Sequence, residues 1–228
     1  MPSMFSRVQK SFLAGFLRKL FRVKIINPEN EPEDITSYIA CINHSSNWDP
    51  IVIGACMHRP LRYMAKAELF KVPVLKSIVK LFGAYPVSRD SADVSSIRTA
   101  INILEKGEIV GMYPQGHRAK RINPSKIVPK NGVAMIAVKA KSGVLPVTVI
   151  SKGYKVKMFH KTLVVFGNYI PFEKFEEFKD SEIKDTDKID KTGKKDIAGN
   201  MNLYKKITEK IYGEMMSNYS KYDTLNKS

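Results

Sequence analysis

Residues 38–50, YIACINHSSNWDP, place a short apolar run directly before a polar loop and an Asp-Pro pair. The run at 38–42 has the length and composition of a buried strand, and the proline is typical of the first turn of a helix, predicted here over 50–58. The loop between them holds His44 and Asp49. Either these two side chains form a catalytic pair, or Asp49 only caps the helix that follows.

The pattern of a short apolar run followed by a helical segment repeats along the chain. Strands are predicted at 38–42, 61–65, 84–87, 109–113, 144–150 and 162–166. Helices are predicted at 50–58, 73–82, 92–106 and 132–141. Such alternation is typical of parallel sheets whose strands are joined by helices. We therefore expect an α/β domain with a largely parallel mixed sheet flanked by helices.

The N-terminal segment has a different pattern. Over residues 4–24, aromatic residues and leucines recur at three- and four-residue spacing, and every charged residue is basic. This pattern predicts an amphipathic helix on a membrane surface, and the alternative is a helix packed on its own domain. We expect a membrane-association helix within residues 1–30, the main domain at 31–175, and a polar connection with a C-terminal helix at 176–228.

The charge of the chain is strongly positive and unevenly distributed. The 228 residues include 38 Lys and Arg against 22 Asp and Glu, a net charge of +16. Residues 171–228 hold 12 lysines and 12 acidic residues, so the whole excess lies before them. Such an excess predicts either nucleic acid or an anionic membrane surface as a partner. Because the basic residues are not interleaved with stacking aromatics and no nucleic-acid-binding motif is present, we expect the membrane and no nucleic acid.

Cysteine content and hydropathy indicate the compartment. The chain has two cysteines, which is too few for a disulfide framework and typical of a reducing compartment. No apolar run reaches the roughly 18–20 residues that cross a bilayer. Basic residues interrupt the N-terminal apolar residues, unlike in a signal peptide. We expect a cytoplasmic protein held peripherally on the inner face of the cell membrane.

Three polar loops begin where predicted strands end. NHSSNWDP follows 38–42, SRDS follows 84–87, and PQGHRAKR follows 109–113. In open parallel α/β sheets, the loops at the carboxyl ends of the strands lie along one edge, where ligands bind. A histidine beside a carboxylate, with guanidinium groups nearby, indicates base catalysis on an anionic substrate. The side chains expected at this edge are His44, Asp49, Arg89, Gln115, His117 and Arg118.

Each of these residues also has a structural explanation. Asp49 before Pro50 suits a helix N-cap, and a lone histidine in a loop is more often non-catalytic. Arg89 and Arg118 could be ordinary solvent-exposed surface charges. The combination on three similar strand ends is what favours catalysis.

The same region contains four possible zinc ligands, namely Cys41, His44, Cys56 and His58. Structural zinc sites usually pair ligands two to four residues apart at each end, whereas a single residue separates Cys56 from His58. Both cysteines also fall in apolar segments, where a thiol is typically a small buried side chain. We therefore expect no metal site.

Several ordered blocks resemble one known family. NHSSNWD resembles the N-H-x-x-x-x-D signature of the glycerolipid acyltransferases, the family of 1-acylglycerol-3-phosphate acyltransferases. Three further blocks match in the same order: GAYPVSR (83–89), YPQGHR (113–118), usually F-P-E-G-T-R, and VLPVTV (144–149). AKAELFKVP (65–73) is also similar to the family. Two residues of the third block depart from the usual pattern, Gln115 in place of glutamate and His117 in place of threonine.

The resemblance implies transfer of a fatty acyl group from acyl-CoA or acyl carrier protein to the hydroxyl of a lysophospholipid, foremost lysophosphatidate. His44 would act as general base and Asp49 would orient it. Arg89 and Arg118 would bind the phosphate. Gln115 and Gly116 would shape the pocket. Weaker substrate-binding candidates are Asn43, Lys66, His117 and Pro146.

No metal or bound cofactor is required by this chemistry. The departure at Gln115 keeps an acceptor oxygen but removes a negative charge. The departures at Gln115 and His117 leave open a membrane-bound relative that has lost catalysis. Two further alternatives are an acyltransferase for another lysolipid acceptor and, from the basic charge, a non-enzymatic protein that binds membrane or nucleic acid.

Overall fold

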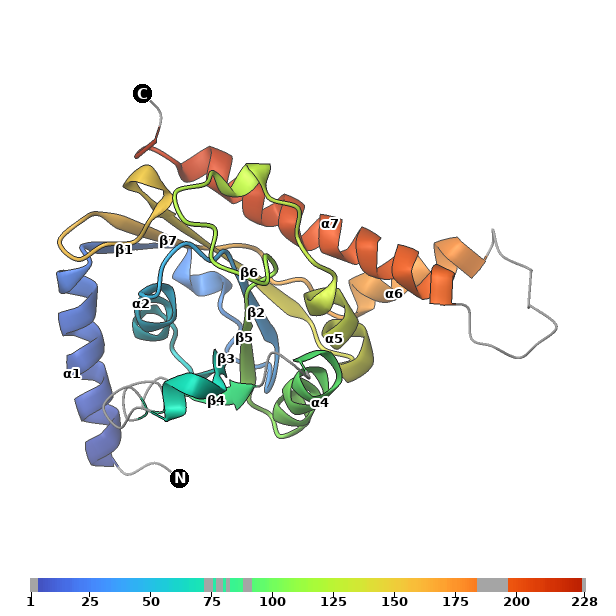
Figure 1. Cartoon of the computed structure of the whole chain (residues 1–228), viewed down its shortest axis with the longest axis horizontal. Helices are drawn as coiled ribbons and strands as arrows, with labels where there is room; N and C mark the ends of the chain where they lie inside the picture. The colour runs from blue at the N-terminus through green and yellow to red at the C-terminus, as the bar shows by residue number, and fades with distance from the viewer. Residues whose placement is uncertain are drawn as a thin grey trace.

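The chain folds into one seven-stranded sheet with helices on both faces (Figure 1). This computed structural model describes residues 4–71, 76, 80, 83–87, 92–183 and 197–226. The strands are β1 (Val23–Ile26), β2 (Ile39–Ile42), β3 (Leu61–Lys66), β4 (Ala84–Val87), β5 (Ile109–Met112), β6 (Val144–Ser151) and β7 (Thr162–Phe166). All six predicted strands are confirmed, and β1 was not predicted.

The strand order is β1-β7-β6-β2-β5-β3-β4, and every neighbouring pair is parallel except β6 with β7. Strands β6, β2, β5, β3 and β4 therefore end at one edge of the sheet. Strands β1 and β7 run the opposite way and begin at that same edge. The expected largely parallel mixed sheet is confirmed.

The two faces of the sheet are covered by different helices (Figure 1). The helices are α1 (Met4–Leu20), α2 (Asp49–Cys56), α4 (Ala92–Glu105), α5 (Gly132–Ala140), α6 (Glu173–Ile183) and α7 (Ile197–Tyr222). Side chains of β2 alternate between two cores, as a strand buried on both faces requires. Ile39 and Cys41 pack with α4, α5 and α7, whereas Ala40 and Ile42 pack with α2 and the end of α1.

The N-terminal region contains more than the expected helix. The α1 helix ends at Leu20, Arg22 takes a left-handed backbone conformation (φ 43°), and β1 then pairs with β7. The region 1–30 therefore includes a strand of the main sheet. At the other end, α6 runs across the expected boundary at residue 175. The helix predicted at 73–82 lies largely outside the described residues.

Within the described residues, no helix is both long enough and apolar enough to cross a membrane.

Candidate active site

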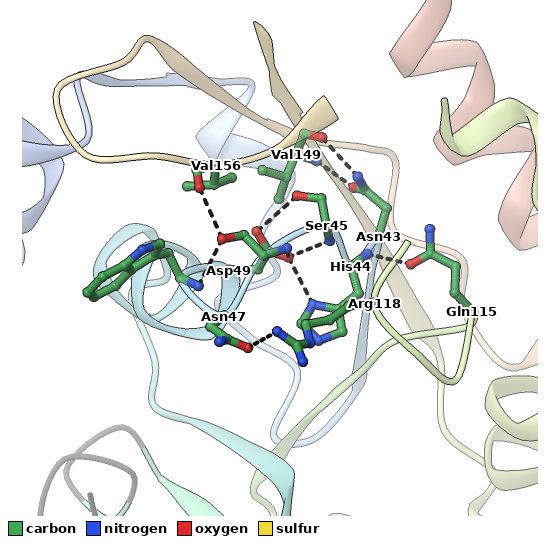
Figure 2. A network of polar contacts seen from close by, with 11 residues as sticks. Asn43, His44, Ser45, Asn47, Asp49, Gln115, Arg118, Val149 and Val156 are labelled. Carbon is green, nitrogen blue, oxygen red and sulfur yellow. Dashed lines mark hydrogen bonds and ion pairs between the residues drawn. The ribbon is translucent and has the colours of Figure 1, made fainter. Parts of the chain in front are cut away.

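His44 and Asp49 are in direct contact at the carboxyl end of β2 (Figure 2). The distance from His44 Nδ1 to Asp49 Oδ2 is 2.9 Å. The Asp49 side chain is fully buried, while 16% of the His44 side chain is exposed. The carboxylate is therefore inaccessible to substrate, and the imidazole is the group that a substrate can reach.

The buried Asp49 carboxylate is held by the loop that precedes it. The backbone N–H groups of Ser45 and Ser46 donate to Oδ2 at 2.6 and 2.7 Å. The Ser45 hydroxyl donates to Oδ1 at 3.3 Å. These bonds, together with His44, satisfy a group whose burial would otherwise be costly.

The helix-cap explanation for Asp49 does not hold in the structure. Helix α2 begins at Asp49 itself, and its N-cap residue, Trp48, makes no side-chain cap bond. The Asp49 carboxylate bonds backward to the loop rather than forward to the first helical turn, as an N-cap would. The buried carboxylate therefore stabilises the loop that carries His44.

Two further contacts fix the loop between β2 and α2. The Asn43 amide donates to Val149 O at 2.9 Å and accepts from Val149 N at 2.7 Å, which ties the end of β2 to β6. The Ser46 hydroxyl donates to Val156 O at 3.0 Å. Asn43 is buried, and the oxygen and nitrogen of its amide are both hydrogen-bonded. It therefore supports the loop that carries His44.

The loop after β5 meets His44 because β5 is the parallel neighbour of β2. The Gln115 side-chain oxygen accepts the His44 backbone N–H, and the Ala119 N–H donates to His44 O at 2.9 Å. The Tyr113 ring stacks on the imidazole with ring centroids 4.1 Å apart. The backbone and the ring face of His44 are therefore both held by this loop.

Gln115 also links this loop to the C-terminal helix. Burial raises the pKa of the Tyr212 hydroxyl to about 12, and a hydrogen bond with the Gln115 side chain acts in the opposite direction. The Tyr212 hydroxyl donates to Pro124 O at 2.7 Å. An amide can accept from His44 and donate to Tyr212, whereas a carboxylate can only accept. The glutamine therefore fits both neighbours at this position.

Two cationic side chains lie beside the histidine loop. The Arg118 guanidinium donates to the Asn47 side-chain oxygen, and Arg118 itself is exposed (Figure 2). Lys130 runs across Gly116: its Nζ lies 3.3 Å from where a Cβ on residue 116 would stand. Gly116 has φ +71°, a conformation that favours glycine. The bare glycine thus leaves room for a lysine side chain next to Gln115.

Residues 22–150 match a family model described as Acyltransferase. The chain belongs to this acyltransferase family. It is 40% identical over 126 residues to the 1-acyl-sn-glycerol-3-phosphate acyltransferase of Bacillus subtilis, covering 54% of this chain and 60% of that protein. It is 29% identical over 167 residues to the protein of the same name from Streptococcus pneumoniae, covering 69% of this chain and 59% of that protein.

The chain therefore spans less than two thirds of the length of these two relatives. Its fold is similar to the crystal structure of the 1-acyl-sn-glycerophosphate acyltransferase PlsC from Thermotoga maritima. The TM-score is 0.62 at 20% identity, and the match covers 96% of this chain and 82% of that one. This likeness establishes an acyltransferase-like fold across nearly the whole chain.

The remaining predicted site residues of this acyltransferase family member lie in different places. Arg89 falls outside the described residues, two positions after β4 ends. His117 is exposed in the loop after β5. Lys66 is the last residue of β3, in register with Val87 of β4, so it stands at the same sheet edge. Pro146 is buried within β6, opposite Cys41 of β2, and so lies inside the sheet.

The zinc alternative is excluded by the positions of the two cysteines. Cys41 belongs to the core on the α7 side of the sheet, and Cys56 belongs to the core on the α2 side. The sheet separates the two thiols, so they cannot ligate one ion. Across the described residues, no group of three His, Cys, Asp or Glu side chains is placed to hold a metal.

Two side chains at the site were not predicted from the sequence. Tyr113 is the first residue of the YPQGHR block, and its aromatic character was the available signal for a ring against His44. Lys130 lies twelve residues beyond Arg118, in a segment with several other basic residues and no pattern of its own. Only the fold brings its side chain over Gly116.

Proposed function

We propose that the protein transfers a fatty acyl group from a thioester, acyl-CoA or acyl carrier protein, to the free hydroxyl of 1-acylglycerol-3-phosphate, giving phosphatidic acid. The observation that carries this proposal is the 2.9 Å contact between a partly exposed His44 and a fully buried Asp49. Membership of the acyltransferase family and the names of the two bacterial relatives support the same reaction.

In the proposed mechanism, His44 acts as general base. With Nδ1 donating its proton to Asp49, Nε2 carries the lone pair that accepts a proton from the substrate. The hydroxyl oxygen attacks the thioester carbonyl carbon as this proton moves to Nε2. The carbon–sulfur bond then breaks, and the proton passes to the departing thiolate, giving a free thiol and the acylated lipid. No acyl-enzyme is needed, because the acceptor attacks directly.

Asp49 would keep the imidazole in this tautomer and stabilise its protonated form during the attack. Tyr113 and Gln115 would keep the imidazole from turning away. General-base catalysis by a positioned histidine contributes about 10²- to 10⁴-fold in rate. We therefore expect most of the activity to depend on the His44–Asp49 contact.

The acceptor phosphate would be bound by the cations beside the loop. Arg118 lies against Asn47, three residues from His44, and Lys130 lies over Gly116. Within the described residues, neither side chain forms an ion pair. Arg89 would be a third ligand. Such charge-assisted contacts would fix the acceptor hydroxyl near His44.

The protein would act at an anionic membrane surface, where both the lysolipid and the product reside. Helix α1 and the basic residues that follow it would hold the domain there, at about 1 kcal/mol per basic side chain close to an anionic leaflet. We propose a peripheral location on the inner face of the cell membrane.

Purified protein should be tested with acyl-CoA and acyl carrier protein as donors against a panel of lysolipids, with the products identified by mass. Formation of phosphatidic acid from lysophosphatidate supports the proposal, and preference for another lysolipid would replace the acceptor. If no acceptor were acylated with either donor, the alternative of a family member without catalysis would be correct.

A further inference from the structure

The loop between β6 and β7, residues 152–161, lies beside the end of α1. Strand β6 ends, and β7 begins, at the edge of the sheet where the His44 loop follows β2. The loop that joins β6 and β7 therefore stands at that edge. Helix α1 leads into β1, which begins at the same edge. The Phe159 N–H donates to Leu20 O at 2.7 Å, so the loop is bonded to the last residue of α1 (Figure 1).

Large apolar side chains are exposed on both of these elements. On α1, Phe12 is 82% exposed, and Phe16, one turn later, is also exposed. On the β6–β7 loop, Phe159 is 70% exposed and Met158 beside it is exposed as well. Several exposed apolar side chains on two elements that are bonded to each other are typical of an interaction site.

The same two elements carry only positive charge. The β6–β7 loop, KGYKVKMFHK, has four lysines and no acidic residue. The end of α1 and the start of β1 add four more basic side chains. The eight cations are Arg18, Lys19, Arg22, Lys24, Lys152, Lys155, Lys157 and Lys161. In the part of the chain that the structure describes, none of them forms an ion pair.

The β6–β7 loop is also connected to the catalytic loop. Val156, in the middle of it, is fully buried, and its carbonyl accepts the Ser46 hydroxyl at 3.0 Å. Ser46 in turn donates its backbone N–H to Asp49. Trp48 is 37% exposed and packs against Phe21, with ring centroids 5.4 Å apart. The exposed apolar side chains therefore stand next to the loop that carries His44.

We propose that the β6–β7 loop is a second membrane-contacting element, which inserts Met158 and Phe159 into an anionic bilayer beside α1. Apolar side chains at the tip and lysines around them match the interfacial and headgroup layers of such a bilayer. The inference rests on the proposed function only in that it places the His44 loop at the surface where a lysolipid would enter.

Vesicle binding by the full chain tests the proposal, with mixed phosphatidylcholine and phosphatidylglycerol vesicles as the probe. Met158→Ser with Phe159→Ser should weaken sedimentation with these vesicles by about tenfold. The matched control is Met201→Ser, which removes another exposed apolar side chain, this one on α7. The control should bind as the native chain does, and all three proteins should unfold at the same temperature.

A charge variant provides a second, independent measurement. Lys157→Glu with Lys161→Glu should weaken binding to anionic vesicles and remove part of its salt dependence, whereas Lys205→Glu with Lys210→Glu on α7 should not. Pure phosphatidylcholine vesicles should not distinguish these variants. If vesicle binding were unchanged while use of an acyl carrier protein donor was lost, the loop would be a protein-docking surface and the proposal would be overturned.

Trp48 is the single tryptophan of the chain and reports directly on this face. Lipids brominated near the headgroup should quench its fluorescence in the native protein, and quenching should fall in the loop variants. Acylation of a detergent-dispersed acceptor should stay unchanged, because Met158 and Phe159 make none of the hydrogen bonds or ring contacts described for His44 and Asp49. Failure of that acylation in the native chain would overturn the proposed reaction but not the membrane contact. Full vesicle binding and quenching by the loop variants would overturn the membrane contact alone.

Discussion

His44 with Asp49 and His58 with Glu31 are both histidines paired with a buried carboxylate. In the first pair the Nδ1-to-oxygen distance is 2.9 Å and the imidazole is 16% exposed. In the second pair the distance is 3.7 Å and the imidazole is 59% exposed. The first imidazole is thus held in one orientation, whereas the second lies largely in solvent.

The two carboxylates also have different hydrogen-bond partners. Glu31 accepts the Tyr38 hydroxyl at 3.0 Å and the backbone N–H groups of His58 and Arg59 at 3.0 and 3.4 Å. Burial, followed by the nearby Glu31 charge, raises the pKa of the Tyr38 hydroxyl. Glu31 therefore joins the segment before β2 to the turn after α2. Asp49 is directed to a histidine that is itself held by Tyr113 and Gln115.

A surface cavity is not what makes the first pair the candidate site. A cavity of about 320 Å³ lies beside the second pair, lined by Glu31, Pro32, Glu33, His58 and Arg59. The pairs differ instead in the imidazole, which is held by Asp49 and Tyr113 in the first pair and is largely exposed in the second. A histidine near a carboxylate is thus a candidate base when its ring is fixed and part of the imidazole stays exposed to substrate.

Removing the imidazoles should give the largest difference between the pairs. His44→Ala should lower kcat/KM for acyl transfer by about 10²- to 10⁴-fold, because the proposed general base is lost. His58→Ala should leave kcat/KM within about twofold, since its ring is mostly solvated. Both are measured by phosphatidic acid formation at matched folded concentration. Equal losses in the two variants would remove the distinction between the pairs.

Neutralising the carboxylates should separate catalysis from stability. Asp49→Asn should reduce turnover by about 10²- to 10⁴-fold in the folded protein, because the orienting acceptor for His44 is replaced. Glu31→Gln should leave turnover nearly unchanged and lower the free energy of unfolding by about 1–3 kcal/mol, as buried donors lose their charged acceptor. Denaturant titration alongside the activity assay measures both effects. A turnover defect in Glu31→Gln would show that the second pair acts in catalysis.

The cations beside the first pair should affect the acceptor alone. Arg118→Lys keeps the charge but loses the planar fork, and Lys130→Met removes the charge over Gly116. Each should lower efficiency with lysophosphatidate by about ten- to hundredfold, mainly through KM, with the thioester KM unchanged. Lys126→Met, in the same segment, is the matched control.

Arg89→Lys should behave as Arg118→Lys does. A monoacylglycerol, which lacks the phosphate, should be used poorly by the native protein and no worse by the variants. The same loss on phosphorylated and unphosphorylated acceptors would mean that these side chains do not bind phosphate.

Among the changes around His44, replacing Gln115 should have the smallest effect on acyl transfer. Gln115→Glu keeps an oxygen for the His44 N–H but cannot donate to Tyr212. We expect the free energy of unfolding to fall by about 1–3 kcal/mol and kcat to stay within about tenfold. Tyr212→Phe removes the hydroxyl, so adding it to Gln115→Glu should cost less than the sum of the two changes. Additive losses would show that Gln115 and Tyr212 are not coupled.

Much of the fold could be predicted because the strands are short apolar runs with clear ends. All six predicted strands and the helices at 92–106 and 132–141 are present within a residue or so. Strand β1 could not be predicted, since its VKII sequence continues the apolar and basic pattern of α1. It is a strand only because β7, far along the chain, offers a parallel neighbour. Helix α6 was missed because most of its residues are charged or polar.

The part of the site that directly follows the predicted strands could be predicted from the sequence. His44, Gln115 and Arg118 lie around one loop, because β2 and β5 are neighbours in the sheet. The burial of Asp49 and its two backbone donors depends on the path of the loop, which no spacing rule encodes. The position of the Lys130 side chain depends on the glycine at 116, which has a left-handed backbone and no Cβ in the way. Both features are set by tertiary packing rather than by local pattern.

The most direct test of the central claim is a double-mutant cycle on His44 and Asp49. The kcat/KM for acyl transfer would be measured at equal folded concentration for His44→Ala, Asp49→Asn and the double variant. If Asp49 acts through His44, the double variant should be no slower than His44→Ala, within about threefold, because residues that act as a unit are not additive. Losses that multiply, or an Asp49→Asn protein that is less stable but turns over normally, would contradict the account.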